Sequence, residues 1–243
     1  TTKRVDIVVH IHDVRRYEAI MINFKEQPME YNCEGTQVRM STSYFKFKCD
    51  GCPESMHALK KPTAFERTVT MLQNANKDVD FVFKMDDDTW LDTSALGRRV
   101  CNIKTKQYYG GFKMHAENID FVSGGAGYLL STDLIKDTDF TKCVKHKYED
   151  VGLAKCLYRQ HSVTPVHLDV NPDTPEKMIE WGLNPSSDHL SKPTFCNPVS
   201  FHYIKPERQM KMKFRSGKRF PNNIHQIWIG SKDPPIAKIN SCR

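Results

Sequence analysis

The stretch Phe81-Val-Phe-Lys-Met-Asp86-Asp87-Asp88-Thr-Trp90 decides the fold class of this chain. An apolar run of strand length stops abruptly at three consecutive carboxylates, which is typical of a buried strand that delivers polar groups to its C-terminal edge. Three adjacent acids repel one another, so a cation is the natural reason to tolerate them. Asp86 and Asp88 point the same way in an extended chain and can share one hard divalent ion. The alternative is a solvent-exposed acidic turn that caps the following helix.

Outward from this stretch, strand and helix patterns alternate along the chain. A loop rich in Cys, Lys, Gly and Pro is expected at residues 42–62. Strands are expected at residues 5–10, 37–41, 79–85, 108–113, 121–123, 163–168 and 199–204, and helices at residues 15–25, 62–76, 93–101 and 149–160, with a further helix that opens at Ser131. This alternation predicts an α/β fold with a largely parallel central sheet.

The composition is that of a globular protein. The 243 residues include 39% hydrophobic and 27% charged residues, which suits one large α/β domain or two small ones. No run approaches the roughly 18 apolar residues that a membrane-spanning helix needs. The net charge of +7 admits a polyanionic partner, but no zinc-finger, RRM or helix-turn-helix pattern supports nucleic-acid binding. The densest basic cluster, at residues 205–219, is interpreted as a solvated tail.

The eight cysteines form an even set, which a secretory protein can use for up to four disulfides. Cys49 and Cys52 make the CxxC pair of the chain and lack the second pair that a structural zinc site needs. We therefore expect disulfides for most of the eight, and the sequence leaves their connectivity open.

A glycine-rich segment, Ser123-Gly-Gly-Ala-Gly-Tyr128, follows a predicted strand. Its glycines let the backbone come close to a ligand or to another strand. The segment matches neither the dinucleotide fingerprint nor the phosphate-binding P-loop. A tight turn without a ligand is the alternative.

Two further signals carry chemistry, each beside a plain structural interpretation. Glu149 and Asp150 stand at a helix start, where the helix dipole stabilises carboxylates, and either could serve as a general base held at a fixed point. His202 lies on the predicted strand 199–204. It is either a structural histidine or, if that strand lies beside the acidic strand end, the residue that completes a metal site.

In this order, the four motifs resemble glycosyltransferase family 31 in its fringe-like branch, and within it the core 1 β1,3-galactosyltransferases. The matching pieces are residues 80–89, 123–131, 149–157 and 200–206, and the resemblance covers roughly residues 5–206. It implies a GT-A fold in one domain over residues 1–206. It also implies Mn²⁺ dependence and an inverting transfer of a hexose, galactose in β1,3 linkage as the first choice. The donor would be a UDP-sugar and the acceptor a glycan or a glycoprotein.

The resemblance also implies a role for particular residues. The metal would be held by Asp86, Asp88 and His202, with Asp88 the more direct ligand and Asp87 in support. The catalytic base maps onto Asp150, with Glu149 beside it. The contacts to donor and acceptor fall on a set shared by the first strand, the acid triplet and the glycine turn: Val9, His10, Asp86, Asp87, Gly125 and Ala126.

Two segments match this pattern poorly, and they bear on the donor. Residues 11–61 and 166–198 depart from it, so a fringe-like β1,3-N-acetylglucosaminyltransferase stays open as an alternative. A non-catalytic, chaperone-like relative is a second alternative, against which the acid triplet and His202 argue. Trp181, in the second segment, could stack on a sugar face, although such an aromatic more often belongs to a core.

The end of the chain departs from the pattern as well. Residues 207–243 form a basic extension, and residues 220–230 resemble the first strand of glycosyltransferase family 32 domains. The extension is either the start of a second transferase domain or an extra C-terminal arm. Relatives in family 31 are Golgi type II membrane proteins, so we expect a secretory-pathway location, a membrane anchor outside this chain, and a lumenal domain for which a homodimer is allowed.

Overall fold

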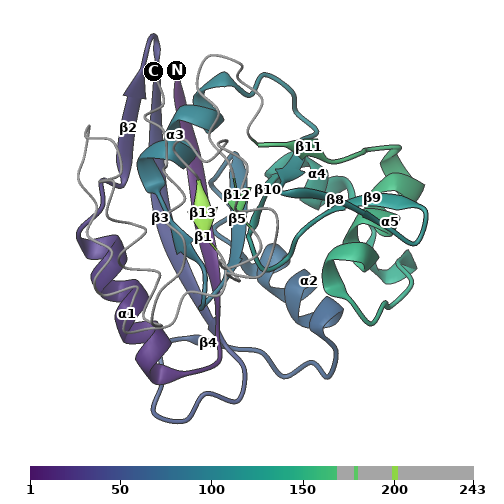
Figure 1. Cartoon of the computed structure of the whole chain (residues 1–243), viewed down its shortest axis with the longest axis horizontal. Coiled ribbons are helices and arrows are strands. Elements are labelled where there is room, and N and C mark those ends of the chain that lie inside the picture. The colour runs from purple at the N-terminus through teal and green to yellow at the C-terminus, as the bar shows by residue number, and fades with distance from the viewer. Residues whose placement is uncertain (169–177, 180–198, 202–243) are drawn as a thin grey trace, which may run out of the picture.

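The computed structural model describes residues 1–168, 178–179 and 199–201, and its centre is a mixed sheet (Figure 1). Within these residues the sheet has eight strands. Their order is β11 (Val166–His167), β7 (Tyr109–Gly111), β10 (Tyr128–Ser131), β5 (Phe81–Asp86), β1 (Thr2–Ile11), β3 (Thr36–Lys46) and β2 (Glu30–Cys33), with β4 (His57–Ala58) beside β3. β1 runs parallel to both β3 and β5, whereas β10 and β2 pair antiparallel. The predicted α/β class with a largely parallel sheet is confirmed.

Helices cover both faces of this sheet. The described helices are α1 (Val14–Lys25), α2 (Ala64–Asn74), α3 (Thr93–Asn102), α4 (Thr132–Asp137) and α5 (Glu149–His161), with a 3₁₀ turn η1 (Phe140–Lys142). Buried residues of α1 and α3 share a core with Ile7 of β1, whereas those of α2, α4 and α5 share another with its neighbour Val8. Because both faces are covered, residues 5–11 of β1 and residues 81–85 of β5 are buried continuously, instead of alternating between buried and exposed.

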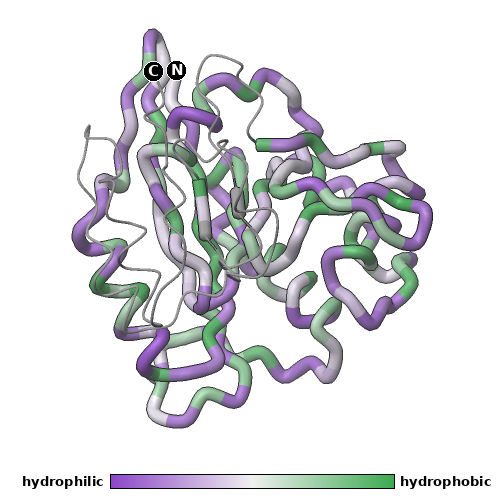
Figure 2. Tube along the Cα trace, viewed as in Figure 1, coloured by the Kyte–Doolittle hydropathy of each residue, from purple (hydrophilic) through white to green (hydrophobic). Residues whose placement is uncertain are grey.

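Two small sheets flank the main one. β6 (Trp90–Leu91) pairs antiparallel with β13 (Ser200–Phe201), which also pairs with β12 (Met178–Ile179). β8 (Lys113–Ala116) and β9 (Ile119–Val122) form a hairpin. Figure 2 shows mixed hydrophilic and hydrophobic colours along α1, as expected for a helix with one face on the core.

Local signals place the helix starts. Thr63 caps α2 in a reciprocal capping box with Glu66, and the Asp92 side chain caps α3 through the backbone N–H of Ala95. Ser131 does precede α4, although its side chain makes no capping bond. Caps of this kind are read from residues three apart, which explains why the sequence predicts them well.

Some element predictions were wrong. The segment 42–62 is not all loop, because β3 continues to Lys46 along the full length of β1 and β4 adds a short strand. The predicted strand 108–113 ends at Gly111, and β8 then begins at Lys113 in the hairpin with β9. β2 and β10 were not expected at all. β2 pairs antiparallel with β3 across a short turn, and β10 pairs antiparallel with β5 and β7, which are more distant in sequence. The periodicity of the sequence does not reveal either pairing.

Six of the eight cysteines pair in the described residues, as predicted. The bonds are Cys33–Cys101, Cys49–Cys52 and Cys143–Cys156. None of the helices in the described ranges combines the length and apolar character needed to cross a membrane. The basic extension 207–243, its family 32 likeness, Trp181 and His202 lie outside the described residues.

Candidate active site

The acid triplet lies at the C-terminal end of β5, beside the end of β1. His10 is the register partner of Asp86 in this parallel pair, and its Nδ1 lies 3.9 Å from Asp86 Oδ1. The side chains of Asp86 and Asp88 are 26% and 18% exposed, whereas that of Asp87 is 0% exposed. Two carboxylates of the triplet are therefore partly exposed and the middle one is buried. β5 ends at Asp86, and Asp87 and Asp88 form the turn that follows it.

Asp87 organises the turn that follows β1. Its Oδ2 accepts the backbone N–H groups of His12 at 2.6 Å and Asp13 at 3.3 Å, and its Oδ1 accepts from Arg16 Nη1 at 2.9 Å. Arg16 also lies 3.8 Å from Asp88 Oδ2. Burial raises the pKa of Asp87, but the bonds from His12 and Arg16 outweigh it and hold that pKa below its ordinary value. The structure thus assigns Asp87 contacts to its own chain, and its predicted supporting role toward a ligand stays a prediction.

A buried lysine joins the triplet to a second acidic element. Lys84 lies two residues before Asp86 on the same side of β5, and its side chain is 2% exposed. Its Nζ donates to Asp86 Oδ1 at 2.8 Å and to Glu149 Oε1 at 3.0 Å. Burial lowers the pKa of Lys84, but these two carboxylates raise it more, so the lysine is charged. A single ammonium therefore brings β5 and the start of α5 together.

The glycine segment 123–128 is a turn that contacts the start of α5. Gly124 N–H donates to Asp150 Oδ2 at 3.1 Å, and a Cβ at Gly124 would collide with Glu149 Oε1. Glu149 Oε2 accepts from the Tyr128 hydroxyl at 3.1 Å. Burial raises the pKa of Glu149 above its ordinary value, with Lys84 acting in the opposite direction. Glu149 and Asp150, the acids predicted to provide the catalytic base, therefore lie at the same end of the sheet as the triplet.

The remaining predicted contact residues are placed differently. Val9 is fully buried in the core on the α1 and α3 side, so its side chain does not face the edge. The carbonyl of Gly125 accepts from Thr89 Oγ1 at 2.5 Å, and that of Ala126 accepts from Ser200 Oγ at 2.6 Å. These bonds tie the glycine turn to the triplet on one side and to β13 on the other.

His10 is buried at this edge, with 7% of its surface exposed. Burial lowers its pKa to about 3, against a smaller opposing effect of Asp86, so its imidazole is neutral at physiological pH. Its Nε2 has no hydrogen-bond partner among the described residues. A neutral imidazole with one open ring nitrogen is a group that can accept a bond from, or donate one to, a ligand at the end of β1.

Of the three predicted metal ligands, Asp86 and Asp88 belong to the described residues, and His202 does not. Asp86 and Asp88 supply partly exposed carboxylate oxygens, the ligand type that suits Mn²⁺. In residues 1–168, 178–179 and 199–201, no three His, Cys, Asp or Glu side chains come together as a metal site. His202 directly follows Phe201, which pairs with Trp90, two residues beyond Asp88. The donor chemistry fits, and the complete set stays a prediction.

Sequence reasoning missed Lys84 and Arg16. A signal for Lys84 was present, because a lysine inside a strand with apolar neighbours must find carboxylate partners. Arg16 gave no such signal, since an arginine on an amphipathic helix is ordinary. Its contact with Asp87 joins residues 71 apart in the chain.

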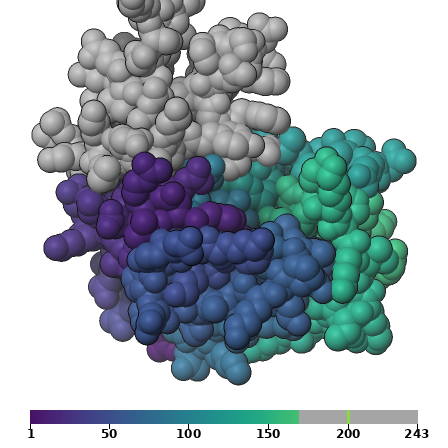
Figure 3. All heavy atoms as spheres, turned by 90° about the horizontal axis from the view of Figure 1, so that it is seen from below, coloured from purple at the N-terminus to yellow at the C-terminus, as the bar shows by residue number. Residues whose placement is uncertain are grey.

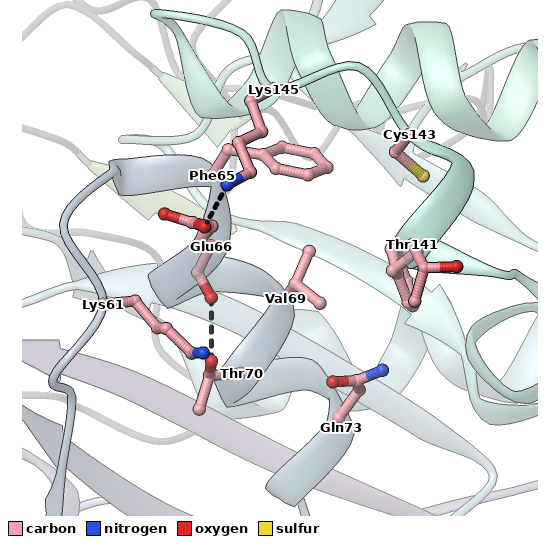
Figure 4. A pocket seen from close by; sticks show the side chains of 10 residues that line it. Lys61, Phe65, Glu66, Val69, Thr70, Gln73, Thr141, Cys143 and Lys145 are labelled. Atoms are coloured by element: carbon pink, nitrogen blue, oxygen red, sulfur yellow. Dashed lines mark hydrogen bonds and ion pairs between the residues drawn. The ribbon is translucent and has the colours of Figure 1, made fainter.

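A separate pocket of about 260 Å³ lies away from this edge, between α2 and the segment 140–145. Figure 3 shows the blue region that includes α2 beside the green region that includes α5. Figure 4 shows Lys145 pointing toward Glu66, and both residues line the pocket. The distance from Lys145 Nζ to Glu66 Oε1 is 2.7 Å. None of the predicted site residues lines this pocket, so it is distinct from the candidate active site.

Comparisons with solved structures return glycosyltransferases at low similarity. The glycosyltransferase GlyE of Streptococcus pneumoniae is 14% identical with a TM-score of 0.47, over 94% of this chain and 59% of that one. The catalytic domain of Drosophila beta1,4-galactosyltransferase 7, in complex with xylobiose, is 11% identical with a TM-score of 0.43, over 96% of this chain and 83% of that one. Likenesses this distant carry no inference about activity.

One comparison by sequence is more informative, although no protein-family model matches the chain. The chain is 26% identical over 178 residues to glycoprotein-N-acetylgalactosamine 3-beta-galactosyltransferase 1 of Xenopus laevis, across 61% of this chain. It spans about half of that relative, 49% of its length. The resemblance to the core 1 β1,3-galactosyltransferase branch of glycosyltransferase family 31, indicated by the four motifs, is thereby confirmed.

Proposed function

We propose that this chain is a GT-A glycosyltransferase domain that transfers a hexose from a UDP-sugar to a glycan or glycoprotein acceptor, with inversion at the anomeric carbon. The first choice of donor is UDP-galactose, and the first choice of linkage is β1,3. The observation that carries the proposal is the meeting of the acid triplet, the glycine turn and the start of α5 around Lys84. The sequence likeness to the galactosyltransferase of Xenopus laevis supports the same class of reaction.

In this proposal the triplet serves the donor. Asp86 and Asp88 would hold Mn²⁺ together with His202, and the ion would neutralise charge that develops on the departing diphosphate. Asp87 keeps the turn after β1 in place through His12 and Asp13. His10 stands at the end of β1, where the nucleoside of the donor would lie, and its buried Nε2 has no partner among the described residues.

Asp150 serves the acceptor. Its carboxylate would take the proton from the attacking hydroxyl, which then approaches the anomeric carbon from the face opposite UDP. The backbone N–H of Gly124 donates to Oδ2 of Asp150, and the backbone N–H of Val151, the next residue, donates to Oδ1. Holding the base at a fixed point at the helix start reduces the entropy that must be lost in the transition state.

The experiment that tests this proposal is a panel of UDP-sugars, assayed with Mn²⁺ and with EDTA. We expect turnover with one donor in Mn²⁺ only, and UDP binding that is tighter in Mn²⁺ than in EDTA. Asp88→Ala should abolish the metal effect on UDP binding. Asp150→Asn should keep that binding and lose about a hundredfold or more in turnover.

Asp50→Asn is the matched control, since Asp50 is an exposed acid in the loop before α2. It should match the unmodified chain in both assays. UDP binding that ignores the metal would refute the metal site, and normal turnover by Asp150→Asn would remove Asp150 from its role. Turnover with UDP-N-acetylglucosamine in place of UDP-galactose would select the fringe-like alternative.

A further inference from the structure

We propose that Lys84 is a positioning residue, which fixes the start of α5, and with it Asp150, relative to the acidic edge of β5. The inference rests on the proposed function for its catalytic consequence. Its structural part, a buried cation that holds two acidic elements in place, can be tested separately.

The contacts of Lys84 use its full bonding capacity. An ammonium group has three protons to donate. Lys84 Nζ has three acceptors, which are Asp86 Oδ1 at 2.8 Å, Glu149 Oε1 at 3.0 Å and the carbonyl of Gly124 at 3.2 Å. Asp86 belongs to β5, as Lys84 does, whereas Glu149 belongs to α5 and Gly124 to the glycine turn. The bonds to Glu149 and Gly124 therefore fix α5 and the glycine turn relative to β5.

Burial makes this arrangement specific. The Lys84 side chain is 2% exposed, so water cannot replace a lost partner. Without the ammonium, the carboxylates of Asp86 and Glu149 would face one another in a site of low polarity, with 26% and 14% of their side chains exposed. Like charges in such a site repel strongly. The start of α5 would then move away from β5.

A displacement of Glu149 would also displace Asp150, because both residues are packed tightly against the glycine turn. The second oxygen of Glu149 accepts from the Tyr128 hydroxyl, and Gly124 has no room for a Cβ beside Glu149. The same Gly124 offers its carbonyl to Lys84 and its N–H to Asp150. Lys84 thus holds the residue before Asp150 in sequence and the residue that bonds Asp150 in space.

The position of Lys84 predicts that removal of its charge lowers turnover without lowering metal affinity. Its positive charge lies 2.8 Å from an oxygen of Asp86, so it opposes a cation at that carboxylate. Removal of the charge should leave Mn²⁺ affinity unchanged or raise it. Displacement of Asp150 should lower turnover. A lysine that only stabilised the fold would lower both together.

The test compares Lys84→Met with Lys113→Met. Lys113 pairs with Asp120 at 2.6 Å on the β8–β9 hairpin, so the control removes a lysine and an ion pair elsewhere. Three quantities are measured: Mn²⁺ binding by calorimetry, amide exchange at residue 124 and residues 149–152, and turnover with the UDP-sugar. For Lys84→Met we expect exchange about tenfold faster at these amides. Turnover should fall about a hundredfold, with the donor KM nearly unchanged.

A second variant covers the case in which Lys84→Met does not fold. Glu149→Gln keeps the lysine and its bond to Asp86 and removes the charge of the α5 partner. It should accelerate exchange at the same amides, which is the readout for this variant. Exchange that matches the Lys113→Met control in every folded variant would overturn the positioning role, as would a parallel loss of metal affinity and turnover in Lys84→Met. If the unmodified chain turns over no donor, the proposed function fails, and the exchange result still decides the positioning role.

Discussion

At the scale of single residues, the three acids of the triplet have different surroundings although they are adjacent in sequence. Asp86 and Asp88 reach the sheet edge, whereas Asp87 is buried and accepts bonds from His12, Asp13 and Arg16. Because the bonds of the Asp87 carboxylate are made within the protein, its main contribution is to the stability of the fold. Asp86 and Asp88, which are partly exposed, are the carboxylates that can bind a ligand.

The change Asp87→Ala should therefore lower the free energy of unfolding by about 3 kcal/mol, because it removes the hydrogen-bond acceptor of Arg16 and of two backbone N–H groups. Urea unfolding measures this difference. Asp88→Ala, at a partly exposed carboxylate, should cost much less. An Asp87→Ala variant as stable as Asp88→Ala would contradict the structural role given to Asp87.

At the scale of elements, the start of α2 contains a carboxylate, Glu66, whose contribution to stability depends on pH. Glu66 accepts from Lys145, and it also accepts from Thr63 in the capping box. The bond from Lys145 first, and then that from Thr63, lowers the pKa of Glu66 to about 2 from an unfolded value of 4.5. The stability that Glu66 contributes is thus present above pH 4.5 and is lost as pH falls toward 2.

Glu66→Gln should remove this pH dependence. Unfolding in urea, followed from pH 6 to the lowest pH at which the chain folds, should show a stability difference between Glu66→Gln and the unmodified chain that shrinks as pH falls. Glu18→Gln, at an exposed acid of α1, is the matched control and should run parallel to the unmodified chain. A constant difference across this range would mean that the Glu66 contacts do not form.

At the scale of the whole molecule, the bond between Cys33 and Cys101 ties the edge strand β2 to α3 across a sequence separation of 68. Closing a loop of this length in the unfolded chain is worth about 4 kcal/mol on the chain-entropy model. Cys33→Ser with Cys101→Ser should lower the unfolding free energy by this order, measured in urea. Cys49→Ser with Cys52→Ser, at a separation of 3, should cost less. Equal losses would contradict the loop-length account.

Much of this molecule follows from local sequence. The apolar run before Asp86 predicts a buried strand, and the caps at Thr63 and Asp92 predict helix starts, because each depends on residues within a few positions. The family resemblance implied that the triplet and the acids Glu149 and Asp150 serve one site. Neither the strand and helix patterns nor the spacing of these motifs placed the start of α5 beside the end of β5.

Other features came only from the tertiary structure. β10 enters the sheet between β7 and β5, Asp87 points inward to Arg16, and Lys84 joins Asp86 to Glu149. Each of these contacts joins residues far apart in the chain, and charge and burial at a distance have no signature in local periodicity. The sequence by itself determined which chemical groups arrive at the edge of the sheet. The packing of distant segments decided which of those groups face outward and which hold the others in place.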